Sequence, residues 1–115
     1  MHIFSEMKSV LVTGGAGFLG SQVVDLLSRR KTHKIIIPRQ KDNDLRNIKN
    51  CIKVTRKVDL VIHLAGNVGG IGYNQANPGA LFYDNLIMGV NLVEACRINS
   101  VKKVVIVGTI CSYPK

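Results

Sequence analysis

A glycine-rich turn near the N-terminus limits the possible fold of this chain more than any other feature. Glycines stand at positions 14, 17 and 20, directly after the apolar run Ser9–Thr13. Gly14 permits a tight turn, Gly17 lets backbone N–H groups approach a pyrophosphate, and Gly20 allows a helix to pack closely on the strand. The apolar run has the composition of a strand buried on both faces. The turn therefore predicts a dinucleotide site at the first strand of a parallel sheet.

Short β-branched runs alternate with longer amphipathic segments along the rest of the chain. The expected helices are 18–30, 45–52 and 78–99, and the expected further strands are 34–37, 59–65 and 102–109, with a Gly-rich loop following 59–65 as far as Gly72. Along 78–99 one stripe is expected to face inward, formed by Leu81, Asn85, Met88, Leu92 and Ala95. This alternation implies right-handed crossovers between parallel strands. The expected fold class is α/β, with a doubly wound parallel sheet of the Rossmann type.

The chain is strongly basic, with 16 Lys and Arg residues against seven Asp and Glu. Three explanations are open: a solvated basic surface, a nucleic-acid partner, or an anionic small ligand. The sequence lacks the features that would support nucleic-acid binding, namely an aromatic-rich sheet motif, zinc-ligand spacing and an uninterrupted basic helix. We therefore expect no nucleic-acid partner, and the glycine turn favours a phosphate-bearing cofactor.

Several further classes of protein are not expected from the sequence. No apolar run approaches the ~18 residues that a membrane span needs, and the N-terminus lacks the basic and apolar regions of a secretory signal. The cysteines at 51, 96 and 111 are too few and too scattered for a disulfide framework or a zinc cluster. We expect a cytoplasmic protein with no membrane partner and no metal.

The choice between NAD and NADP depends on the residues that follow the second strand. An acid there accepts hydrogen bonds from the ribose 2′-OH of NAD, whereas a cation pairs with the 2′-phosphate of NADP. The chain has Arg39 at this place, with Lys41 and Arg46 nearby. We therefore expect NADP(H) as the cofactor, unless Arg39 merely faces solvent.

Longer motifs carry a resemblance to a known family. The spacing G-x-x-G-x-x-G after Thr13 resembles the short-chain dehydrogenase/reductase superfamily, and 59–66 resembles the D-x-V-x-H-L-A-A strand of its extended branch, the NAD-dependent epimerase/dehydratase family. The blocks 68–86 and 107–115 resemble V-G-G-I…N…P…F…N-L and G-[ST]-x-C-x-Y-P-K of the GDP-L-fucose synthases. Those NADPH-dependent enzymes epimerise and then reduce GDP-4-keto-6-deoxy-mannose. The resemblance covers about 10–115.

The resemblance implies roles for individual residues. Thr109 stands where the family has its catalytic Ser or Thr, whose hydroxyl would hydrogen-bond the C4 carbonyl of the sugar. Cys111 matches a cysteine implicated as proton donor or acceptor in epimerisation. His63 is expected to pack in the sheet rather than catalyse. The expected cofactor-binding residues are Gly14, Gly15, Ala16, Gly17, Phe18, Leu19, Gly20, Arg39, Asp44, Leu45, Leu64, Ala65, Gly66 and Asn85. Asp44 and Leu45 align with contacts to the adenine. Some members of the family carry an Arg in the glycine turn where this chain has Ala16, so Arg39 would have to compensate.

The catalytic Y-x-x-x-K pair of the superfamily is missing from this sequence. Its tyrosines, Tyr73, Tyr83 and Tyr113, are not followed by lysine four positions later. We therefore expect 1–115 to be an NADP(H)-binding Rossmann domain, incomplete at its C-terminal end, without the domain that binds the GDP-sugar and inactive alone. Another nucleotide-sugar epimerase or dehydratase, and a non-catalytic NADP(H)-binding regulatory module, are the alternatives. Full-length relatives are expected to form homodimers.

Overall fold

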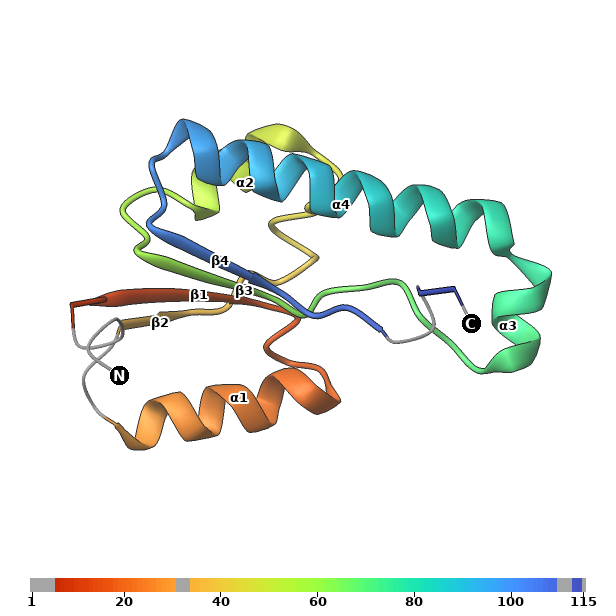
Figure 1. Cartoon of the computed structure of the whole chain (residues 1–115), viewed down its shortest axis with the longest axis horizontal. Coiled ribbons are helices and arrows are strands. Elements are labelled where there is room, and N and C mark those ends of the chain that lie inside the picture. The colour runs from red at the N-terminus through yellow and green to blue at the C-terminus, as the bar shows by residue number, and fades with distance from the viewer. Residues whose placement is uncertain (1–5, 31–33, 110–112, 115) are drawn as a thin grey trace.

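Four parallel strands form the centre of the structure, a computed structural model that describes residues 6–30, 34–109, 113 and 114. The strands are β1 (Ser9–Thr13), β2 (Lys34–Ile36), β3 (Leu60–His63) and β4 (Lys103–Ile106). They lie in the order β2-β1-β3-β4 across the sheet (Figure 1). In the register of the sheet, Val10 of β1 lies between Ile35 and Leu60, and Leu60 in turn pairs with Lys103. The expected α/β class with a parallel sheet is confirmed.

Helices cover both faces of the sheet. Their bounds are α1 (Phe18–Arg29), α2 (Ile48–Val54), α3 (Ile71–Ala76) and α4 (Pro78–Ile98). Figure 1 shows α1 on one face, with α2 and α4 on the other and α3 at the start of α4. The buried core correspondingly lies on both faces of the sheet, with a further cluster formed by Leu45, Cys51 and Ala95. On the α4 side it is centred on Leu11, Val61 and Leu92, and on the α1 side on Val10, Val12 and Leu60.

The strand order places a topological switch point between β1 and β3. The chain leaves β1 through α1 to reach β2 on one side, and later returns through α2 to β3 on the other side of β1. The segments after β1 and β3 therefore lead to opposite faces of the sheet (Figure 1). Ligands of open α/β sheets bind at the carboxyl ends of the strands at such a point.

Several local predictions were wrong. The strands expected over 34–37, 59–65 and 102–109 are shorter, and span Lys34–Ile36, Leu60–His63 and Lys103–Ile106. The helix expected over 45–52 begins only at Ile48, because the Asn47 side chain accepts a hydrogen bond from the Lys49 N–H at 3.0 Å and caps it. The segment expected to be a Gly-rich loop passes directly into α3. This short helix ends at Ala76, where the Asn77 side chain donates to the Tyr73 carbonyl at 3.0 Å and Pro78 starts α4.

The acid stability of the fold is expected to depend on Asp59. Its carboxylate pairs with Lys102 at 3.0 Å and accepts the backbone N–H groups of Lys8 at 2.9 Å and Ser9 at 3.1 Å. These hydrogen bonds, first that of Lys102, lower the pKa of Asp59 to about 2. The contribution of Asp59 to stability is therefore complete above the unfolded-state pKa of about 4 and is lost as the pH falls through about 2. Urea unfolding across this range is expected to show a smaller loss of stability in Asp59→Asn than in the wild type.

A matched control for this prediction is Asp25→Asn on α1. Asp25 pairs with Arg29 at 2.7 Å, but both side chains are largely exposed, and exposed ion pairs of this kind contribute little. The control variant should keep the acid profile of the wild type. Equal profiles for Asp59→Asn and the wild type would contradict the role assigned to Asp59.

Candidate functional site

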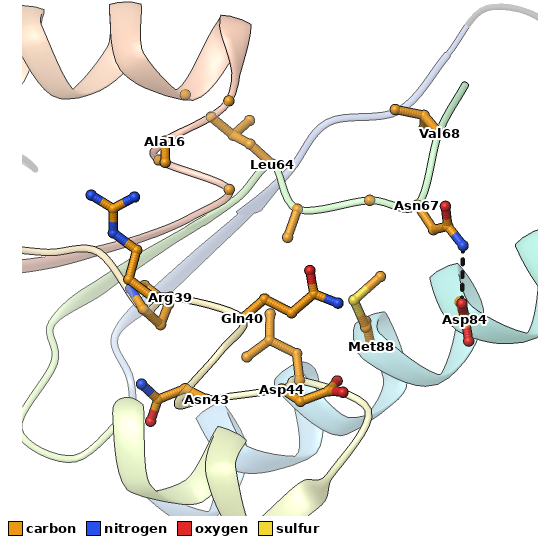
Figure 2. A pocket seen from close by; sticks show the side chains of 18 of the residues that line it. Ala16, Arg39, Gln40, Asn43, Asp44, Leu64, Asn67, Val68, Asp84 and Met88 are labelled. Atoms are coloured by element: carbon orange, nitrogen blue, oxygen red, sulfur yellow. Dashed lines mark hydrogen bonds between the residues drawn. The ribbon is translucent and has the colours of Figure 1, made fainter. Parts of the chain in front are cut away.

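A cavity of about 760 Å³ lies at the carboxyl ends of β1 and β3 (Figure 2). Three chain segments form its walls: the glycine turn after β1, the loop after β2, and the segment after β3, with two side chains of α4 beside them. The lining residues are Gly14, Gly15, Ala16, Gly17, Phe18, Leu19, Gly20, Pro38, Arg39, Gln40, Asn43, Asp44, Leu45, Arg46, Leu64, Ala65, Gly66, Asn67, Val68, Asp84 and Met88. Its volume is in the range of small-molecule and cofactor sites.

The glycine turn brings backbone to backbone at the floor of the cavity. Gly14 has φ +69°, and a Cβ placed on it would lie 2.7 Å from the Ala65 nitrogen. A Cβ on Gly20 would collide with the Gly14 carbonyl. The N-terminus of α1 therefore stands directly on the turn and next to the segment after β3. A side chain at Gly14 or Gly20 would prevent this close contact between backbone segments, which explains why both positions are glycine.

The first turn of α1 can bind an anion. Gly17 at its N-cap has no side chain to accept the first helical N–H groups, and the turn carries no acidic residue. The N–H groups at a helix start lack intrahelical partners and carry partial positive charge. They face a cavity with room for phosphate groups, which is the arrangement that dinucleotide-binding turns use.

Two arginines of the loop after β2 line the cavity, and their charges are balanced differently. Arg46 pairs with Asp44 at 2.7 Å and with Asp84 at 3.3 Å. Within the described part of the chain, no carboxylate lies in ion-pair distance of Arg39. In Figure 2 the Arg39 guanidinium turns toward the end of the cavity where Ala16 lies. Arg39 is therefore the cation that this wall offers to an anionic ligand.

Asp44 lines the cavity, but its carboxylate is engaged. Hydrogen bonds from the Arg46 side chain and backbone N–H lower the pKa of Asp44. The carboxylate thus stays ionised, and Arg46 takes part of its capacity to accept hydrogen bonds. The adenine-side contact expected at Asp44 has to share this carboxylate with Arg46.

The segment after β3 is fixed to α4 through Asn67, which sequence reasoning missed. Asn85 accepts the Asn67 backbone N–H at 2.7 Å and donates to the Asn67 carbonyl at 2.9 Å. Asp84 accepts from the Asn67 side chain at 3.0 Å, the bond drawn in Figure 2. Asn85 itself does not line the cavity. It acts one residue behind the wall by holding Asn67 in place.

The other expected cofactor-binding residues all lie on the cavity. The residues that were not expected there are Pro38, Gln40, Asn43, Arg46, Asn67, Val68, Asp84 and Met88. Met88 belongs to the inward stripe predicted for 78–99, and Arg46 had been noted as a possible partner of a phosphate. For Asp84 and Asn67 the sequence offered no signal, because their hydrogen bond joins residues 17 positions apart.

Of the two expected catalytic residues, the structure describes only Thr109, and it is not part of this cavity. Thr109 is exposed, follows β4 and does not line the cavity, and Cys111 lies outside the described residues. Cys51 and Cys96 are buried, and burial raises the pKa of each thiol to about 11, as expected for cysteines that only pack. His63 is buried in the sheet, as predicted.

The residues that the structure describes contain no group of three His, Cys, Asp or Glu side chains that could hold a metal ion. Of the helices described, none is both long and apolar enough to span a bilayer.

The chain is similar to known proteins over nearly its whole length. The model of the NAD dependent epimerase/dehydratase family matches residues 10–115. GDP-mannose 3,5-epimerase 1 of Oryza sativa subsp. indica is 36% identical over 126 residues, which cover 96% of this chain and 33% of that protein. GDP-L-fucose synthase of Azorhizobium caulinodans is 35% identical over 109 residues, 93% of this chain and 35% of that protein.

A solved structure of a similar protein matches nearly the same part of this chain as these two relatives do. A GDP-L-fucose synthetase from Naegleria fowleri bound to NADP superimposes with a TM-score of 0.80 at 32% identity, covering 94% of this chain and 33% of that one. The chain thus spans about a third of the length of the relatives it matches.

Proposed function

The chain belongs to the NAD-dependent epimerase/dehydratase family, and from this premise we propose that it is the NADP(H)-binding part of a GDP-sugar epimerase/reductase. The reaction proposed for the whole enzyme is the conversion of GDP-4-keto-6-deoxy-mannose to GDP-L-fucose. One observation carries the cofactor assignment: the cavity joins a glycine turn at a helix start to Arg39, a cation without a carboxylate partner among the described residues. We assign residues 1–115 to this cofactor-binding domain.

The residues present fit a dinucleotide phosphate. A Cβ on Gly17 would lie 3.2 Å from the Gly14 carbonyl oxygen, a tight contact, so glycine gives the turn its close packing at the start of α1 beside the cavity. The N–H groups of Phe18 and Leu19 would hold the pyrophosphate, Arg39 would pair with the 2′-phosphate, and Leu45 would pack on the adenine. When bound, the cofactor supplies a hydride. The role of this chain is to bind and orient it.

The sugar chemistry is proposed from the resemblance and from the relatives. Relatives named for GDP-sugar reactions support a GDP-sugar substrate. Thr109 would donate its hydroxyl to the C4 carbonyl, and Cys111 would exchange a proton next to that carbonyl. The sequence holds no Y-x-x-x-K pair, so we expect the 115-residue chain to bind NADPH without turning it over.

A second candidate function is the epimerisation of GDP-mannose. It is favoured by the 36% identity to the rice GDP-mannose 3,5-epimerase. The two functions differ in their net chemistry, because a reductase consumes NADPH in proportion to product and an epimerase alone does not. A regulatory NADP(H)-binding module would catalyse neither the reduction nor the epimerisation.

We propose that the whole enzyme is a cytoplasmic homodimer. The outward side of α4 carries apolar side chains at helical spacing, and Phe82, Leu86 and Val90 are each at least half exposed. A second copy of the helix could cover them, as is expected of the full-length relatives.

The function is tested by a chimera. In it, this chain replaces the matched third of the Azorhizobium GDP-L-fucose synthase, and a parallel chimera uses the rice epimerase. We expect the first to oxidise NADPH in proportion to GDP-4-keto-6-deoxy-mannose, while the isolated chain binds NADPH but oxidises none. Epimerisation of GDP-mannose by the second chimera alone would favour the other candidate, and NADPH oxidation by the isolated chain would refute its expected inactivity.

A further inference from the structure

A buried group of hydrogen bonds lies under the cavity floor and joins β1 to β3. The Thr13 hydroxyl oxygen is 2.7 Å from Nδ1 of His63, and 3.2 Å from each of the backbone nitrogens of Leu64 and Ala65. Thr13 is fully buried and His63 is 8% exposed. Water therefore has little access to these groups, and their hydrogen bonds must be met within the protein.

The donors and acceptors around the Thr13 hydroxyl determine which nitrogen of the His63 ring carries the proton. A hydroxyl group donates one hydrogen bond and accepts two. The N–H groups of Leu64 and Ala65 can only donate, so the Thr13 oxygen accepts from both, although the Leu64 N–H is shared with the Thr13 carbonyl at 3.2 Å. The hydroxyl proton is left for His63. Nδ1 must then be the acceptor, and the neutral ring carries its own proton on Nε2.

The same hydroxyl sets the position of a cavity wall. The peptide between Leu64 and Ala65 lies directly against Gly14, where a Cβ would meet the Leu64 carbonyl carbon at 2.8 Å. Leu64, Ala65 and Gly14 all line the cavity. A hydroxyl that turned its proton elsewhere would lose one of the two N–H bonds, and the peptide would no longer be held against the turn.

We propose that His63 is a positioning residue of the cofactor cavity. As the Nε2–H tautomer it accepts the Thr13 hydroxyl proton at Nδ1, and through Thr13 it holds the Leu64–Ala65 peptide against the glycine turn. A histidine that merely fills space in the core would need neither a fixed tautomer nor an acceptor at this nitrogen. The use of NADPH as a probe rests on the proposed function, whereas the tautomer does not.

The tautomer is tested first, without cofactor. Long-range proton–nitrogen NMR spectra of the ¹⁵N-labelled chain at pH 7 distinguish protonated from unprotonated ring nitrogens. We expect one histidine in a single neutral form with Nε2 protonated, its signals absent in His63→Asn and shifted in Thr13→Val. A proton on Nδ1 of His63, or an even mixture of tautomers, would overturn the proposal.

The effect on the cavity is tested with a matched pair of variants. His63→Leu removes the acceptor at similar size, whereas His63→Asn returns an oxygen near the place of Nδ1. We expect NADPH to bind His63→Leu about tenfold more weakly than the wild type, the loss of one net hydrogen bond. His63→Asn should restore most of this affinity. Equal affinities for the two variants would overturn the positioning role.

Thr13→Val and Thr13→Ser repeat the test from the other partner. If His63→Leu fails to fold, these two variants still test the positioning role. Loss of NADPH affinity in the valine variant and its recovery in the serine variant are expected, and equal affinities would count against the proposal. A wild-type chain that binds no NADPH at all would refute the proposed function, while the NMR spectrum would still decide the tautomer.

Discussion

Replacing Gly20 by alanine is expected to lower the free energy of unfolding by about 3 kcal/mol and to abolish cofactor binding. The new Cβ would collide with the carbonyl oxygen of Gly14 and lie 2.7 Å from both the Gly14 carbonyl carbon and the Gly15 Cα. All three atoms are backbone, so no side chain can rotate away. The start of α1 would have to separate from the turn that it completes.

The matched control is Gly89→Ala in the interior of α4. Gly89 is also a helical glycine, but nothing lies within 4 Å of the Cβ it would gain. Alanine is preferred over glycine in a helix by about 1 kcal/mol, so this variant should be as stable as the wild type or more so. Urea unfolding followed by circular dichroism, together with NADPH titration, compares the two. Similar unfolding midpoints would show that the turn can yield, contrary to this expectation.

Reversing the charge at Arg39 is expected to invert the choice of cofactor. In Arg39→Glu we expect the affinity for NADPH to fall roughly 100-fold, on the order of the 1.5–3 kcal/mol of a hydrogen bond to a charged group. The carboxylate would repel a 2′-phosphate but could accept hydrogen bonds from the 2′-OH of NADH. Binding of NADH should therefore be retained. Arg46 cannot replace Arg39 readily, because Asp44 and Asp84 already pair with it.

The control variant Lys53→Glu distinguishes a local effect of the charge at Arg39 from a general effect of the net charge. It changes the net charge equally, but Lys53 is exposed on α2 and does not line the cavity. Dissociation constants for NADPH and NADH, measured at two salt concentrations, should change little in this control. Equal losses in both variants would indicate a long-range effect of net charge, and an unchanged NADPH affinity in Arg39→Glu would assign the phosphate to another group.

The fold was predictable because its signals are local. The apolar run of β1 and the helical spacing of α4 are short-range patterns, and the strand Ser9–Thr13 has the predicted bounds. The errors at the helices arose where a single side chain decides a boundary. Asn47 caps α2 at Ile48, and Asn77 ends α3, and neither effect appears in apolar periodicity.

The candidate site was predictable where it consists of a contiguous motif or, as with Arg39, of a residue at an expected place after a strand. The glycine turn and the segment Leu64–Gly66 could be placed on the cavity from spacing and resemblance. The engagement of Arg46 by Asp84 joins residues 38 positions apart, and the Asn67–Asn85 pair joins residues 18 apart. Such pairs form only in the folded chain, so a linear pattern gives no sign of them.

The bond between Thr13 and His63 also has a consequence for the order of folding. The two residues are 50 positions apart, and β1 has its second neighbour only when β3 arrives. Contacts of such separation close large loops and slow the folding reaction. During synthesis the glycine turn must therefore emerge long before the peptide that rests on it. A nucleotide that needs both can bind only after the central strands have joined, so it stabilises the assembled sheet at the expense of every earlier intermediate.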